Sequence, residues 1–280
     1  MKNICVFIVL IIVSLSRLEA SLHSIKAIIF DCDGTLVDTE RILCEAWISA
    51  FQKQGYDLTE KEYWDFLHQN NIAGFPTADR IIAKWGSEIL NKECQNELLK
   101  DSKAYSRHIR TTQGFPPIEP TLLFLHELAG MKEELGVKIG LASGNNKENI
   151  LFFLKAFGIE DYFDVIVSGY DDLSHYQDKE GTNKPKPYVY QEAARLLGVL
   201  TSECAAIEDS ITGVTSAVDA GCITIAVPNL ATREHDLSRA HLKIESFSGI
   251  GVELFFKLVE DIQNHTEANM KDLRFDLVLL

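Results

Sequence analysis

The stretch IKAIIFDCDGT, residues 25–35, decides the fold and already indicates where a site lies. It opens with a mostly apolar run, which predicts a buried β-strand. Side chains two apart on a strand point to the same side, so Asp31 and Asp33 share a face and Cys32 points away. Two carboxylates this close repel each other, and packing alone does not explain them. We therefore expect something at the end of this strand that offsets their charge.

Beyond residue 120 the chain alternates between helical and strand patterns. Each stretch with helical spacing is followed, after a short connection, by a short apolar run. This alternation is typical of βαβ units and of a parallel sheet with helices on both faces. The sequence therefore predicts an α/β fold with a doubly wound parallel sheet that includes strand 25–30. The predicted helices are 120–135, 146–157, 187–197 and 211–220, and the strands that follow them are 137–142, 163–167, 204–207 and 222–227.

Residues 40–112 show no such strand and have helical spacing, interrupted by glycines. We interpret them as a small helical domain inserted after the first strand. The proline-rich segment GFPPIEP, residues 114–120, would return the chain to the sheet. The predicted domains are a core of residues 21–39 and 113–280 and a helical domain of residues 40–112.

The first twenty residues have the pattern of a secretory signal peptide. Lys2 precedes the apolar run ICVFIVLIIVSLS, and the small residue Ala20 stands at a suitable cleavage point. The run is shorter than the roughly 20 residues that a spanning helix needs, which disfavours a permanent anchor. We expect a signal peptide at residues 1–20 and export to the periplasm or the medium. The alternative is a buried N-terminal strand or a misassigned start, with a cytoplasmic protein.

The composition restricts the partners. The formal net charge is −14 at pH 7 and no basic block is present, which argues against binding of nucleic acid or anionic lipid. Of the six cysteines, one lies in the first twenty residues, and the other five are too scattered for a disulfide framework or a zinc site. We expect a small-molecule partner, no membrane contact once the signal is removed, and a monomer.

Polar groups stand at the carboxyl ends of the predicted strands, where open α/β sheets bind ligands. Taken alone, each of these polar groups also has a structural explanation. Ser143 and Ser210 could cap the helices that follow, and Lys184 could be a solvated loop lysine. The acidic pair at 208–209 could favour a helix dipole. Together they supply what one reaction needs, which favours a shared site. The groups are Asp31, Asp33 and Thr35 in DCDGT, Ser143 and Gly144 in LASGNN, Lys184 in NKPKP, and Glu208, Asp209 and Ser210 in EDS.

The four carboxylates of this set predict a metal-assisted phosphoryl transfer. Carboxylates that converge in one cleft need a cation, and hard oxygen ligands suit Mg²⁺. An ionised aspartate can attack phosphorus without a base, so Asp31 is the predicted nucleophile and would form an aspartyl phosphate. Asp33 can protonate the leaving oxygen and later deprotonate the attacking water. The expected metal ligands are Asp31, Asp33, Glu208 and Asp209.

The remaining groups of the set are suited to binding a phosphate. Thr35, Ser143 and Lys184 are predicted to hold the phosphoryl oxygens, and Lys184 supplies the positive charge that the acidic chain otherwise lacks. Gly144, next to Ser143, is expected to belong to the same substrate site. The predicted partner is therefore a small phosphate ester.

The motifs DCDGTLVDTE, LASGNN, NKPKPYVY and AIEDSITGVTSAVDAG resemble those of the haloacid dehalogenase superfamily, in its branch of phosphatases and phosphomutases with a helical cap after the first motif. The resemblance extends from about residue 25 to residue 229. It implies a Rossmann-like core, magnesium dependence and phosphoryl transfer through Asp31. Residues 40–112 would be the cap, with which this family reads the leaving group.

The cap sequence bears on the choice of substrate. The loop at Gly74 and Phe75 is expected to face the cleft and contact the substrate, although a turn between two helices is an equal alternative. The sugar phosphomutases that resemble this chain carry a histidine where Leu43 stands and an arginine where Asn71 stands. These departures favour a phosphatase acting on a small phosphomonoester, with a sugar phosphate as the expected substrate. A β-phosphoglucomutase-like activity is the alternative.

Overall fold

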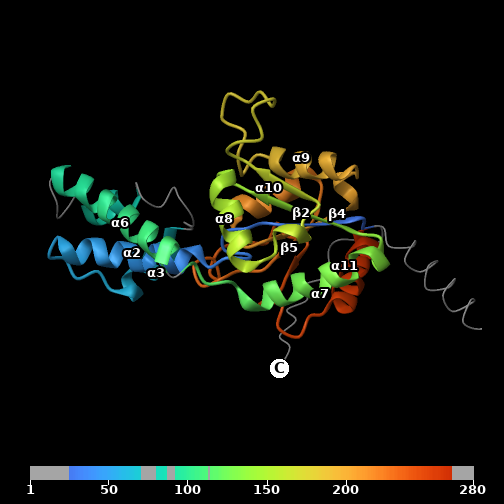
Figure 1. The fold of residues 1–280 in the computed structure, drawn as a ribbon, viewed down its shortest axis with the longest axis horizontal. Coiled ribbons are helices and arrows are strands. Elements are labelled where there is room, and N and C mark those ends of the chain that lie inside the picture. The colour runs from blue at the N-terminus through green and yellow to red at the C-terminus, as the bar shows by residue number, and fades with distance from the viewer. Residues whose placement is uncertain (1–24, 71–79, 87–91, 113, 267–280) are drawn as a thin grey trace, which may run out of the picture.

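The computed structural model describes residues 25–70, 80–86, 92–112 and 114–266 (Figure 1). These residues contain one six-stranded sheet in the order β3-β2-β1-β4-β5-β6. All neighbouring strands are parallel. The predicted α/β fold with a doubly wound parallel sheet is confirmed. The strands are β1 (Ala27–Phe30), β2 (Lys138–Ser143), β3 (Val165–Ser168), β4 (Cys204–Glu208), β5 (Ile223–Ala226) and β6 (Leu242–Lys243).

The sheet is buried on both faces, as its apolar strands require. Along β1, Ile28 and Phe30 enter one hydrophobic cluster, while Ala27 and Ile29 enter another on the opposite face. This two-sided burial explains why the strands read as continuous apolar runs. The first cluster is covered by α7 (Glu119–Leu135), α8 (Lys147–Phe157) and α11 (Val252–Thr266), and the second by α9 (Tyr188–Leu197) and α10 (Ile211–Ala220).

Side-chain caps fix where two of the core helices begin. Asn146 precedes α8 and accepts a hydrogen bond from the backbone N–H of Asn149. Ser210 precedes α10, and its hydroxyl accepts one from the N–H of Gly213. Such caps satisfy backbone donors that the first helical turn leaves without partners. The capping role considered for Ser210 is thus correct, whereas the cap of the helix after Ser143 is Asn146.

The helices between β1 and α7 form a separate unit beside the sheet, which we call the cap (Figure 1). The cap has a hydrophobic cluster of its own, in which Phe51, Tyr63 and Leu98 are fully buried. The helical pattern predicted for this part of the chain is therefore correct where the structure describes it. Where the structure describes it, the cap contains α2 (Thr39–Lys53), α3 (Glu60–Asn70), the π-helical turn η1 (Ile82–Gly86) and α6 (Lys92–Thr112).

Two segments join the cap to the core, and they are hydrogen-bonded to each other. The N–H of Asp38 donates to the carbonyl of Pro116 at 2.8 Å, and the N–H of Ile118 donates to the carbonyl of Leu36 at 2.9 Å. The outgoing chain after β1 and the proline-rich return therefore lie side by side. This pairing anchors the cap directly next to the Asp31 motif.

Several elements were not predicted from the sequence. They are β6, α11 and the short 3-10 helices η2 (Glu160–Tyr162) and η3 (Thr201–Glu203). The predicted signal peptide, residues 1–20, lies outside the described residues. Within the part of the chain that the structure describes, no helix is both long and apolar enough to cross a membrane.

Candidate active site

The strand order places the site in the centre of the sheet. The chain runs from β1 to β2 and β3 on one side and then returns to β4 on the other side of β1. Ligands of such sheets bind at the carboxyl ends of the strands where the order reverses, here between β1 and β4. Asp31 follows β1 and Glu208 ends β4, while Ser143 ends β2 on the other side of β1. The topology thus brings three of the predicted groups to one edge.

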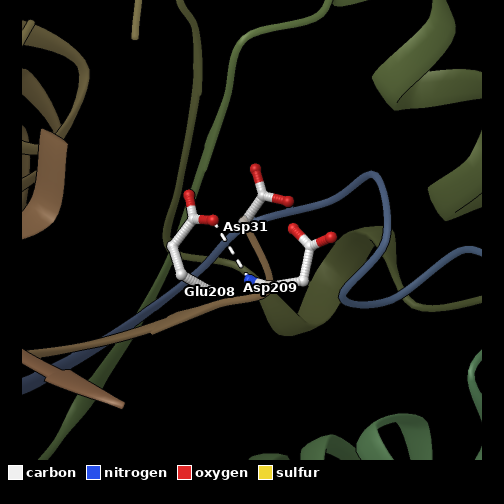
Figure 2. Close-up of side chains that lie close together, drawn as sticks. All are labelled: Asp31, Glu208 and Asp209. Carbon is white, nitrogen blue, oxygen red and sulfur yellow. Dashed lines mark hydrogen bonds between the residues drawn. The ribbon is translucent and has the colours of Figure 1, made fainter. Parts of the chain in front are cut away.

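Three buried carboxylates meet at this edge. Asp31, Glu208 and Asp209 each offer a carboxylate oxygen within 4.8 Å of the others, and Figure 2 shows the three carboxylates gathered together. The residues are only 5%, 0% and 3% exposed. The N–H of Asp209 donates to Glu208 Oε2 at 3.2 Å, which fixes one orientation of the Glu208 carboxylate. We call this set the acidic triad.

Lys184 lies against the acidic triad and supplies one positive charge. Its Nζ lies 2.6 Å from Asp31 Oδ1 and 2.6 Å from Glu208 Oε1. Burial alone would lower the pKa of Lys184, but the two adjacent carboxylates outweigh it and raise that pKa. The hydroxyl of Tyr190, on α9, donates to the same oxygen of Glu208 at 2.7 Å. Lys184 is therefore a charged group held between Asp31 and Glu208 at the carboxyl ends of the strands.

One lysine does not neutralise three buried carboxylates. Burial raises the pKa of Asp31 to about 8, and the charges of Glu208 and Asp33 add to the effect of burial, with Lys184 opposing them. Burial likewise raises the pKa of Asp209 well above its usual value, with Glu208 and Asp31 contributing. Groups that hold protons for lack of positive charge are suited to receive a cation in place of those protons. The all-oxygen donor set fits a hard divalent ion.

The carboxylate of Asp33 does not join the acidic triad. It accepts hydrogen bonds from the Ser143 hydroxyl at 3.3 Å and from the Asn145 amide at 3.2 and 3.3 Å. Burial raises the pKa of Asp33, and the bonds from Asn145 and Ser143 partly offset that rise. The two aspartates expected to share a metal thus point their carboxylates to different partners. Asp33 is instead placed as a carboxyl group able to exchange a proton.

The other predicted substrate residues surround this pair. Thr35 is 1% exposed, and among the described residues its hydroxyl has no hydrogen-bond partner, so it is available to a ligand. Ser143 accepts from the N–H of Asn145 at 3.1 Å. The carbonyl of Gly144 accepts from the Asn183 side chain, next to Lys184 in the chain, at 2.8 Å. Gly74 and Phe75, predicted to reach the substrate from the cap, lie outside the described residues.

Two glycines allow the acidic side chains to approach the backbone. A Cβ atom on Gly34 would lie 2.3 Å from Asp209 Oδ2, and Gly34 also has a φ of +84°, which favours glycine. A Cβ atom on Gly213, in the first turn of α10, would lie 1.9 Å from the Glu208 carboxylate. Both glycines belong to sequence motifs of the site, and the close approach is the physical reason that they are required there.

Sequence reasoning missed three residues that contact the predicted groups. They are Asn145, which donates to Asp33, Tyr190, which donates to Glu208, and Asn229, which donates to Asp209 at 2.8 Å. Asn145 and Tyr190 stand in quoted motifs and Asn229 lies eight residues beyond the last of them, but nothing in the sequence pattern separates the three from ordinary polar residues. Asp171 and Asp172 accept hydrogen bonds from Lys147 and hold the loop after β3.

Comparison with known proteins identifies the class. The family model of the haloacid dehalogenase-like hydrolases matches residues 25–221, and the chain belongs to this family. The expected hydrolase class is thereby confirmed.

Individual relatives cover most of the chain. The Bacillus subtilis protein YhcW is 32% identical over 208 residues, which are 74% of this chain and 86% of that protein. Hexitol phosphatase B of Escherichia coli is 28% identical over 208 residues, 74% of this chain and 85% of its own. Among solved structures, CbbY of Rhodobacter sphaeroides in complex with xylulose 1,5-bisphosphate has a TM-score of 0.59 at 23% identity and covers 82% of this chain and 98% of its own. That last similarity concerns the fold alone.

Proposed function

We propose that this protein is a magnesium-dependent phosphatase that hydrolyses a small phosphomonoester, in particular a sugar phosphate. The observation that carries the proposal is the arrangement around Asp31. Its carboxylate touches a charged lysine on one side and belongs to an acidic triad, while a second carboxyl group, Asp33, stands two residues away with separate partners. This is the set of a nucleophile, a charge-stabilising group, a metal site and a proton donor.

The first half of the reaction transfers the phosphoryl group to the protein. An oxygen of the ionised Asp31 forms a bond to phosphorus while the bond from phosphorus to the ester oxygen breaks. Asp33 donates its proton to that leaving oxygen, which departs as an alcohol, and Asp33 becomes a carboxylate. Thr35, Ser143 and Lys184 donate hydrogen bonds to the non-bridging phosphoryl oxygens. The product of this half is an acyl phosphate on Asp31.

The second half releases phosphate. The Asp33 carboxylate removes a proton from a water molecule, whose oxygen attacks phosphorus while the bond to the Asp31 oxygen breaks. Asp31 returns as a carboxylate and Asp33 is protonated again, so both residues are restored. Asp31, Glu208 and Asp209 would hold the Mg²⁺, which supplies positive charge that offsets the repulsion between the anionic ester and the anionic nucleophile. We assign the Asp33 carboxylate to proton transfer and not to the metal, because it faces Ser143 and Asn145.

The substrate class is supported by the name of a relative. Hexitol phosphatase B, by its name, acts on a phosphorylated sugar alcohol. The alternative, a β-phosphoglucomutase-like activity, is disfavoured because Leu43 stands on α2 where the resembling mutases have a histidine. We therefore give the phosphatase first place and let the assay decide between them.

The experiment measures phosphate release by the chain that begins at Ser21 from hexose, pentose and hexitol monophosphates, with and without Mg²⁺. Release that needs Mg²⁺ and disappears in Asp31→Asn is the expected result. A matched control is Asp161→Asn, which changes an exposed aspartate of η2 and should keep full activity. No release from any ester, together with conversion of β-glucose 1-phosphate to glucose 6-phosphate when a sugar bisphosphate is added, would replace the phosphatase by the mutase.

The place of action is a separate proposal. We propose that the enzyme is exported after cleavage following Ala20, on the strength of the charged start and the apolar run. Expression in a bacterial host followed by determination of the N-terminal residue tests this. Recovery outside the cytoplasm with Ser21 as the first residue is expected, and an intact N-terminus in the cytoplasm would reject export.

A further inference from the structure

The loop that follows β5 contacts the acidic triad through Asn229. The amide nitrogen of Asn229 donates to Asp209 Oδ2 at 2.8 Å and to the carbonyl of Gly34 at 3.0 Å. An amide nitrogen has two hydrogens, and here one is donated to Asp209 and the other to the carbonyl of Gly34. Because Asp209 is almost fully buried, the bond from Asn229 holds one of its oxygens at a fixed position.

The other half of the Asn229 amide is bound to its own loop. Its oxygen accepts from the N–H of Ala231 at 2.8 Å and from the N–H of Thr232 at 3.3 Å. Its backbone N–H donates to the Thr232 hydroxyl at 3.0 Å. The side chain of Asn229 therefore cannot turn away from Asp209 without rearranging residues 229–232.

The same loop packs against the cap. Ala231 is fully buried and belongs to the hydrophobic cluster of the cap helices, together with Trp64 and Leu67 of α3. The preceding residue, Leu230, accepts a hydrogen bond on its carbonyl from Nε2 of His68, also on α3, at 2.9 Å. Asn229, which contacts Asp209 of the acidic triad, is thus followed directly by two residues that contact the cap.

We propose that Asn229 is a positioning residue that holds the Asp209 carboxylate for the metal ion, and that the docked cap fixes Asn229 through Leu230 and Ala231. This inference rests on the metal site of the proposed function. By linkage, any change that loosens α3 from the loop weakens metal binding, and bound metal favours the docked cap to the same degree. The cap then acts on the reaction through the metal ion.

The test is isothermal titration of Mg²⁺ into the chain from Ser21 without any substrate. Asn229→Ala should weaken Mg²⁺ binding about tenfold, the effect of losing one hydrogen bond to a charged group. His68→Leu, which has no contact with the acidic triad, should weaken it by a smaller factor, about two- to threefold. His68→Gln keeps a donor that can reach the Leu230 carbonyl and should restore the wild-type affinity.

A matched control is His126→Leu. His126 lies on α7 and makes an exposed hydrogen bond to the Tyr162 hydroxyl at 2.8 Å. His126→Leu therefore removes a histidine hydrogen bond, as His68→Leu does, but at a place remote from the loop and the cap. It should bind Mg²⁺ as the wild type does. Thermal melting by circular dichroism verifies that each variant is folded, and the His68 variants carry the test alone if Asn229→Ala does not fold.

Three results separate the possible failures. Wild-type affinity in Asn229→Ala would overturn the positioning role, and wild-type affinity in His68→Leu, or a loss in His68→Gln equal to that in His68→Leu, would overturn the link to the cap. The proposed phosphatase activity is contradicted by a different result, in which Mg²⁺ binds but no phosphate is released from any ester. Since the titration contains no ester, that failure leaves the inference about Asn229 standing.

Discussion

The ammonium group of Lys184 lies 2.6 Å from Oδ1 of Asp31, and both side chains are buried. The two residues are far apart in sequence and meet because β1 ends next to the loop that leads into α9. The same ammonium group lies 2.6 Å from Glu208. Lys184 thus contacts two members of the acidic triad, the predicted nucleophile Asp31 and Glu208, and its charge is the main compensation for these carboxylates within the described residues.

Replacing Lys184 tests this compensation. Lys184→Met leaves Asp31 and Glu208 buried without their cation, so phosphate release should fall at least about 10²-fold. The free energy of unfolding without Mg²⁺ should fall by about 3–5 kcal/mol, because breaking a buried ion pair leaves a charge without a partner. Initial rates and denaturant unfolding measure the two effects.

The matched control for this variant is Lys186→Met. Lys186 also carries two acidic partners, Glu180 and Asp178, but the three residues form a loop cluster away from the acidic triad. Solvent-screened pairs of this kind contribute little, so activity and stability should stay near the wild-type values. Equal behaviour of the two lysine variants would contradict the role of Lys184.

A second prediction concerns the close approach at Gly34. Gly34→Ala should abolish Mg²⁺-dependent activity, because its Cβ atom would lie 2.3 Å from Asp209 Oδ2 and 2.6 Å from Asn229 Nδ2. Gly136→Ala is the control for backbone strain alone. Gly136 also has a positive φ, +65°, but a Cβ atom there meets nothing within 4 Å. Gly136→Ala should lower the free energy of unfolding by about 1–2 kcal/mol and leave the specific activity intact. Full activity in Gly34→Ala, measured by phosphate release, would contradict a steric clash between this Cβ atom and the side chains of Asp209 and Asn229.

The parts of the fold that the sequence predicted are those that depend on pattern alone. The apolar runs of 25–30 and 204–207 are buried on both faces and therefore read as strands without tertiary information. Their carboxyl ends meet because parallel neighbours share one edge, which brought Asp31 and Glu208 together. By contrast, β6 spans only Leu242–Lys243, too short to leave a pattern.

The details of the site depend on which side chain turns to which. Asp31 and Asp33 look equivalent in the motif, but the first faces Lys184 and the second faces Asn145. That difference arises from the loop after β2, which is distant in sequence. The contact of Asn229 with Asp209 likewise joins two strand ends that only the folded sheet brings together. Sequence spacing carries no information on such pairings.

A third prediction concerns the proton on Asp33. Burial raises the pKa of Asp33, and the Asn145 amide partly offsets this by stabilising the charged form. In Asn145→Ala that stabilisation is lost, so the pKa rises further and Asp33 stays protonated to a higher pH. The decline of activity on the alkaline side, where the proton donor is lost, should therefore move to higher pH in rate measurements across pH.

Asn146→Ala is the control for this prediction. Asn146 is adjacent in the chain but caps α8 and accepts from Asn149. Its loss should lower stability by about 1 kcal/mol and leave the alkaline decline unmoved. A decline that stays in place in Asn145→Ala, or moves to lower pH, would show that Asn145 does not control the Asp33 proton.

The last prediction concerns the pH dependence of stabilisation by Mg²⁺. The pKa of Asp31 is raised to about 8 in the folded protein without metal, mainly by burial, from a usual value of 3.8. Between these two values the folded chain holds a proton that the unfolded chain has lost, so this group makes stability fall as pH rises through that window. Mg²⁺ binding replaces the proton, and the rise in Tm at a fixed Mg²⁺ concentration should be larger at pH 8 than at pH 6.

Calorimetric titration of Mg²⁺ near pH 6.5 in buffers of different ionisation enthalpy should show proton release. In Asp31→Asn the release should decrease, whereas a Tm shift equal at both pH values in the wild type would contradict proton displacement from the acidic triad.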